Sequence, residues 1–183
     1  LTAAARTYTP QEYRAGGIWH AQSWQNEGWG FLDTLGEYAQ AIDWQARAMS
    51  RIELKAAEVL PEGPQILDEG PAADLMAAFC GGTPGHAAFL AAITPHLLVP
   101  GEGWLIAEAA TPSTPLAAAD WSVFSTDCVD VRGGGYWVQV GDTMWRPLAA
   151  ESLPMRIYRP KPHYPWLATS PTQAAIPIMR RID

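Results

Sequence analysis

The sequence contains little of what builds disulfide frameworks, zinc sites and membrane spans. It has only two cysteines, Cys80 and Cys128, and their spacing indicates neither a disulfide framework nor a zinc site. Reduced thiols are the default expectation, although a bridge between the two stays open. No apolar run approaches the ~20 residues that cross a bilayer, so we expect no membrane partner.

Catalytic motifs are also lacking. The chain has no nucleophile elbow, Walker loop, zincin motif or dinucleotide fingerprint. Gly133-Gly134-Gly135 lacks a following Lys-Ser/Thr pair and stands between predicted strands, which favours a hairpin turn. His86 and His96 are too far apart on one predicted helix to share a metal. We expect no enzyme and no cofactor, and assign no catalytic, cofactor-binding or metal residue.

Charge is scarce and its balance is acidic. Charged residues make up 17% of the 183 residues, 48% are hydrophobic, and the net charge is −7. That composition indicates a globular chain with one domain, or one domain plus an arm. A protein that grips DNA through phosphates is basic, so strong phosphate binding is not expected.

Tryptophan is the residue type that the chain has in excess, with nine copies between Trp19 and Trp166. Large rigid aromatics fill cores, anchor interfaces or stack on ligands. The carboxylate pairs Asp68-Glu69 and Asp127/Asp130 leave a glycan-active site open as an alternative, since tryptophans and paired carboxylates occur together in such sites.

The first half of the sequence predicts mainly helices. Residues 1–26 read as an N-terminal arm, and residues 27–50 as one amphipathic helix with glycines that permit close packing. Alternation predicts a half-buried strand at 51–59, followed by a loop at 60–70. Two helices follow, at 71–80 and 83–98, and then a strand at 104–108.

The second half predicts mainly strands. Segments 121–125, 136–140, 144–147 and 155–159 read as a late antiparallel β-meander. The prolines of 160–171 predict an extended connector with little regular structure. Ser170-Pro171 opens a helix that runs to the chain end, so we expect a fragment of a longer subunit. The fold class is α+β, with early and central helices.

One long block resembles a known family. Residues 154–178, PMRIYRPKPHYPWLATSPTQAAIPI, are similar to a block in portal proteins of tailed phages that infect actinobacteria, which runs RI-[WY]-RPHP-x-[YF]-x-W-x-A-x-SP-x-x-AA-x-PIL-RE-I. Lys161 stands where histidine is usual, and residues 179–182 replace the usual ending. Residues 99–106 resemble the family's PGE-x-[WY]-L element, and Trp24 through Arg51 its early helix.

The resemblance implies a portal wing-like domain at 27–159. Residues 160–183 would be a Pro-rich connector and the start of a helix that leads to a missing stem and clip region. It also implies a ring at one capsid vertex, a dodecamer of about twelve copies, that conducts DNA during packaging and ejection. Another virion structural protein, a minor capsid or connector component, is the alternative.

The partners follow from the same resemblance. They are further copies of the chain, the major capsid protein, the terminase, the head-tail adaptor and double-stranded DNA that passes without sequence-specific binding. The expected location is the virion, with assembly in the host cytoplasm. Trp24 and Trp29 stand just before the amphipathic stripe, and we expect them at a subunit interface or against the arm.

Overall fold

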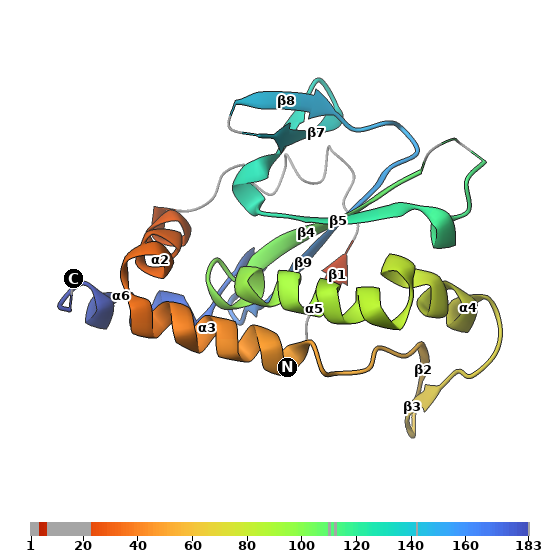
Figure 1. Cartoon of the computed structure of the whole chain (residues 1–183), viewed down its shortest axis with the longest axis horizontal. Coiled ribbons are helices and arrows are strands. Elements are labelled where there is room, and N and C mark those ends of the chain that lie inside the picture. The colour runs from red at the N-terminus through yellow and green to blue at the C-terminus, as the bar shows by residue number, and fades with distance from the viewer. Residues whose placement is uncertain (1–3, 7–22, 110, 112, 142, 183) are drawn as a thin grey trace.

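The computed structural model describes residues 4–6, 23–109, 111, 113–141 and 143–182, and they form a layered α+β fold (Figure 1). A four-stranded antiparallel sheet, in the order β1-β9-β4-β5, lies between a three-stranded sheet, β6-β7-β8, and a layer of helices. The predicted α+β class is confirmed. The strands of these two sheets are β1 Ala4–Arg6, β4 Glu102–Glu108, β5 Asp120–Phe124, β6 Val129–Arg132, β7 Gly135–Val140, β8 Met144–Pro147 and β9 Leu153–Tyr158.

The helices gather early and centrally, as predicted. The α5 helix has the predicted bounds and carries a proline in its first turn, where no backbone N–H is needed. The N-cap of α6 is Ser170, whose side chain accepts a hydrogen bond from the Gln173 N–H at 3.2 Å. The helices are α2 Ser23–Thr34, α3 Gly36–Met49, α4 Pro71–Ala78, α5 Thr83–Leu98 and α6 Pro171–Met179.

The single helix predicted at 27–50 is wrong, because the chain breaks at Leu35. Leu35 has φ −100° and ψ 102°, and Gly36, a poor helix former, follows it directly. The break turns α3 relative to α2, so that Phe31 of α2 and Tyr38 of α3 pack into one cluster with α6. Among the glycines, Gly28 makes the expected close approach, since an added Cβ would lie 3.1 Å from Thr172 Cγ2.

The half-buried strand predicted at 51–59 and the loop at 60–70 are also wrong. The structure instead has a hairpin, β2 Ala57–Leu60 with β3 Gly63–Ile66, which forms a sheet of its own. Ile52 is 49% exposed and Val59 is 85% exposed. The apolar residues that alternate with polar ones at 51–59 therefore do not pack on a core.

The predicted late meander is divided between two sheets. Only β6-β7-β8 form a meander, whereas β5 and β9 flank β4 in the central sheet. The four-residue strand β6, Val129–Arg132, was not predicted, because its alternation is so short. Glycines with φ of +59° and +87°, Gly133 and Gly134, lie between β6 and β7 as expected for a hairpin turn.

The segment expected as an extended connector contains a small hairpin, β10 Pro160–Lys161 with β11 Tyr164–Ala168. The prolines are accommodated because a two-stranded hairpin has open edges, where a missing N–H costs no ladder bond. The predicted arm contributes β1, which pairs with β9. Residues 7–22 of the predicted arm lie outside the described residues.

The cores lie on both faces of β4. Every residue from Glu102 to Ala107 is buried, because one face packs on β6-β7-β8 and the other on α5. Between the two sheets lies the largest cluster: Trp104, Ile106, Val129, Val131, Tyr136, Val138, Tyr158 and Ala168. Two smaller clusters join α2, α3, α5 and α6.

Within the described part of the chain, no single helix is long and apolar enough to cross a membrane. The segments 71–81 and 83–98 reach that length and composition only as a pair, which is bent by 71°.

Candidate functional site

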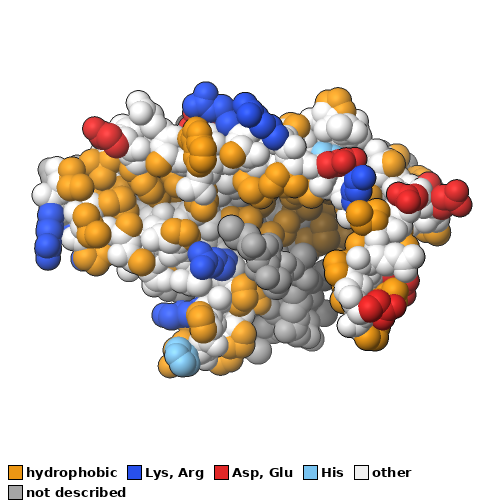
Figure 2. Space-filling view, turned by 90° about the horizontal axis from the view of Figure 1, so that it is seen from below, with side chains coloured by type: hydrophobic (Ala, Val, Ile, Leu, Met, Phe, Trp, Pro, Cys, Tyr) orange, Lys and Arg blue, Asp and Glu red, His pale blue; other side chains and the backbone are white. Residues whose placement is uncertain are grey.

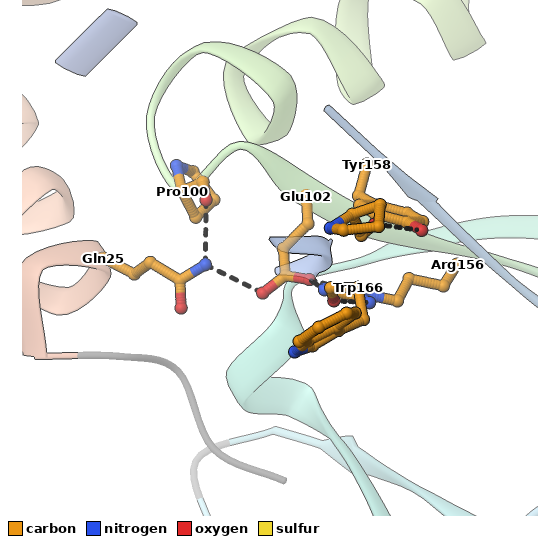
Figure 3. Close-up of polar contacts among 7 residues, drawn as sticks. Gln25, Pro100, Glu102, Arg156, Tyr158 and Trp166 are labelled. Carbon is orange, nitrogen blue, oxygen red and sulfur yellow. Dashed lines mark hydrogen bonds and ion pairs between the residues drawn. The ribbon is translucent and has the colours of Figure 1, made fainter. Parts of the chain in front are cut away.

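A buried ion pair joins the two central strands (Figure 3). Glu102 in β4 and Arg156 in β9 are diagonal neighbours on one face of the antiparallel pair. Arg156 Nε lies 2.6 Å from Glu102 Oε2, and the Nη2 group bonds the same oxygen. The two side chains are 1% and 5% exposed. Two charges so far from water are tolerated because each satisfies the other.

Helix α2 reaches the same carboxylate through Gln25 (Figure 3). The Gln25 Nε2 group donates to Glu102 Oε1 at 2.8 Å and to the Pro100 carbonyl at 2.8 Å. Gln25 is 1% exposed, so this amide belongs to the interior of the protein. The first turn of α2 is thereby fixed to the start of β4.

The β10–β11 hairpin joins the network from the other side. Arg156 Nη1 donates to the Trp166 carbonyl at 3.0 Å, and the Tyr158 hydroxyl donates to the Pro165 carbonyl at 2.9 Å. The guanidinium lies 4.2 Å from the centre of the Tyr158 ring, a cation–π distance. The network therefore holds four chain segments in one arrangement.

The N-terminus of α6 docks on the turn between α5 and β4. The Ser170 hydroxyl donates to the Val99 carbonyl at 2.7 Å, and the Thr172 hydroxyl donates to the Leu98 carbonyl at 2.7 Å. Gly101, with φ +78°, permits this approach, since an added Cβ would lie 2.4 Å from the Thr169 carbonyl oxygen.

Both tryptophans predicted at an interface lie in α2 and are half-buried. Trp24 packs on the cluster that includes Phe31 and Met179. Trp29 packs on the cluster that includes Ile42, and its ring meets His96 edge-on at 5.3 Å. The structure thus places them in separate clusters within the chain, and their role between subunits stays a prediction.

An open pocket of about 610 Å³ lies beside Trp29. Burial lowers the pKa of His96, although the carboxylate of Asp127 acts in the opposite direction. Burial, followed by the charge and hydrogen bond of Asp127, raises the pKa of the Cys128 thiol. A neutral imidazole beside a protonated thiol lacks the charge state of an activated cysteine nucleophile. The pocket residues include Asn26, Trp29, His96, Ser125, Asp127 and Cys128.

A second pocket, of about 520 Å³, lies between α5 and the β4–β5 edge and has mostly apolar walls. It contains Cys80, and burial raises the pKa of that thiol to about 11. Neither cysteine forms a disulfide. Cys80 is therefore a poor nucleophile at neutral pH.

The remaining candidate groups have structural partners or lie apart. Asp130 accepts from the Arg132 Nε at 2.7 Å and from the Val131 N–H at 2.7 Å. His86 Nε2 bonds the Met76 carbonyl at 2.8 Å. Over the described ranges, no three His, Cys, Asp or Glu residues are placed to hold a metal ion. His20 lies outside those ranges.

Sequence reasoning missed the Gln25–Glu102–Arg156 network. The sequence contained one signal of this network. Arg156 stands two positions from both Pro154 and Tyr158, so the three side chains share one face of the strand, and that face is buried. A charged residue in the inward register of a strand needs a buried partner of opposite charge. The sequence does not reveal that the partner is Glu102, which lies 54 positions earlier.

Comparisons with protein-family models, with curated proteins and with solved structures found no match to this chain.

Proposed function

We propose that this chain is part of a portal subunit of a tailed phage, a structural conduit for DNA at one capsid vertex. The observation that carries the proposal most is the meeting of the three segments that resemble the portal family. Gln25 comes from the early helix, Glu102 from the PGE element and Arg156 from the long C-terminal block, and all three share one buried hydrogen-bonded network. The three segments thus form one buried unit, as the parts of a single wing-like domain would.

The long block also behaves as one structural unit. It includes Arg156 and Tyr158 of β9, the β10–β11 hairpin and helix α6. These parts are joined to each other and to the start of β4 by the bonds of Arg156, Tyr158 and Ser170. Such a unit would hold a following stem at a fixed angle to the wing, as a rigid ring requires.

The chemistry of the described residues supports a structural role. The pockets contain cysteines whose pKa values are raised by burial, and the net charge is −7. A channel wall that bound phosphates strongly would slow DNA. The partners of this proposal are further copies, capsid protein, terminase, adaptor and passing DNA.

The test is negative-stain electron microscopy of the gene product that contains this chain, expressed alone and with its capsid protein. We expect closed rings with a central hole, of about twelve subunits. A matched sample with Trp24→Ala and Trp29→Ala tests the predicted interface, with the exposed Trp44→Ala as control. Uniform monomers under both conditions would contradict the portal proposal and favour a peripheral virion protein, and a glycan-hydrolysis screen would test the glycan-active alternative.

A further inference from the structure

The β2–β3 hairpin projects from the body of the protein (Figure 1). Its four residue pairs, from Ala57–Ile66 to Leu60–Gly63, form a sheet with no third strand among the described residues. Val59 is 85% exposed and Ile66 is 53% exposed. A lone two-stranded hairpin is marginally stable in water, and large apolar side chains exposed on such a projection indicate a docking surface.

The hairpin lies in the most acidic stretch of the chain. Residues 53–74 carry six carboxylates and one lysine, a net charge of −5, while the whole chain carries −7. The one lysine of this stretch, Lys55, has its Nζ 3.5 Å from a Glu53 carboxylate oxygen. The carboxylates of the hairpin itself, Glu58 and Glu62, are exposed to solvent. An apolar surface with an acidic rim fits a partner that is apolar and basic.

The same chain presents a surface of that kind on the β10–β11 hairpin. Residues 152–182 contain five Lys or Arg residues and no Asp or Glu. Arg159 and Lys161 lie at the hairpin, whereas Arg156 is buried and Arg180 pairs with Glu27. Tyr164 is 49% exposed and Trp166 is 47% exposed, with their rings edge-on at 5.8 Å. Lys161 Nζ lies 6.0 Å from the Tyr164 ring, and Arg159, two residues earlier in the chain, is exposed. Tyrosine, tryptophan and arginine are the residue types that dominate binding hot spots.

Figure 2 shows the underside of the protein, where most acidic side chains lie at the right, whereas most basic ones lie at the top, at the left, in the centre and at the lower left. The right side of this view is also the side on which the β2–β3 hairpin lies in Figure 1, because the two views differ by a turn about the horizontal axis. Two surfaces that complement each other and face outward from one chain suit a contact between copies.

We propose that the β2–β3 hairpin of one copy docks on the β10–β11 hairpin of the next copy. This inference deepens the proposed function, on which it rests, because it names the surfaces of the subunit contact. The contact uses two different surfaces, so a pair of copies retains one free β2–β3 hairpin and one free β10–β11 hairpin. Repetition of such a heterologous contact closes a ring where the rotation permits and otherwise gives a filament.

Charge reversal on each hairpin tests the contact. The first variant is Glu58→Lys with Glu62→Lys, and the second is Arg159→Glu with Lys161→Glu. We expect each variant alone to weaken self-association by at least about tenfold at low salt, because like charges then meet. A mixture of the two variants should associate again, since each reversed hairpin complements the reversed hairpin of the other variant.

Sedimentation velocity measures the association, and electron microscopy identifies its product. The control is Asp120→Lys with Glu151→Lys, which alters the net charge as the first variant does but at exposed residues outside both hairpins. We expect this control to assemble as the wild type does. Circular dichroism confirms that each variant folds, and recovery in the mixture excludes misfolding as the cause of the loss.

The outcomes separate this inference from the portal proposal. If the wild type forms rings and either reversal leaves them unchanged, the hairpin contact is overturned and the portal proposal stands. If the mixture recovers but the products are open filaments, the contact is supported and the ring is contradicted. A wild type that is monomeric at every concentration overturns the contact. A wild type whose hairpins bind capsid protein but not another copy of the chain also overturns it.

Discussion

At the scale of single residues, Arg156 is the buried side chain that links strand β4 to the β10–β11 hairpin. It bonds Glu102, bonds the Trp166 carbonyl and stacks on Tyr158, while only 1% of its side chain is exposed. Its loss would leave the Glu102 carboxylate buried without a cation. The cost of an uncompensated buried charge exceeds the value of the pair itself.

We therefore expect Arg156→Met to lower the free energy of unfolding by about 3–5 kcal/mol. The matched control is Arg146→Met, which removes an ion pair with Glu108 whose arginine side chain is 42% exposed. That change should cost about 1 kcal/mol or less. Urea denaturation at neutral pH measures both. Equal losses in the two variants would show that the buried pair has no special role, whereas adding Glu102→Leu to Arg156→Met should recover part of the stability.

At the scale of elements, the sequence predicts what local chemistry determines and misses what distant packing determines. The bounds of α5 follow from Pro84 and the double glycine before it, and the cap of α6 follows from Ser170. Gly36 weakens the helix next to Leu35, but a glycine alone does not predict a break, because Gly28 and Gly30 lie within α2. The packing of α2 and α3 on α6 is the part that no local pattern contains. Likewise, the alternation of apolar and polar residues at 51–59 does not show whether this segment joins a larger sheet with a buried face.

Gly85 gives an element-scale prediction, because α5 passes very close to the turn before it. A Cβ on Gly85 would lie 1.6 Å from the Cys80 carbonyl oxygen, so Gly85→Ala forces the backbone apart. We expect a loss of at least about 3 kcal/mol. The control is Gly30→Ala in α2, where nothing lies within 4 Å, and which should gain up to about 1 kcal/mol from helix propensity. Thermal and urea denaturation measure both, and a Gly85→Ala protein as stable as the wild type would refute the close approach.

At the scale of the whole molecule, the candidate site was the part least accessible to prediction. Trp24 and Trp29 were singled out by their position, yet the structure places them in two separate clusters. The bonded pairs of the buried network lie far apart in the chain: Gln25 and Glu102 are 77 positions apart, and Glu102 and Arg156 are 54 positions apart. Contacts at such separations arise from topology, and alternation along one strand cannot specify them.

The same topology predicts which parts of the molecule open first. Strand β4 is buried on both faces and pairs with β5 and β9, so its amides should exchange hydrogen only through global unfolding. The β2–β3 hairpin has one partner strand for each strand and an exposed apolar surface. Its amides should exchange at least about a hundredfold faster than those of β4 in the monomer.

Hydrogen–deuterium exchange with mass spectrometry measures this difference peptide by peptide. In the assembled state, protection should rise in residues 57–66 and 160–168 together, because the proposed contact buries both hairpins. Protection of β4 should remain as it is in the monomer, which makes β4 the internal control. A hairpin already as protected as β4 in the monomer would mean that it packs on its own chain. The contact between copies would then need another surface.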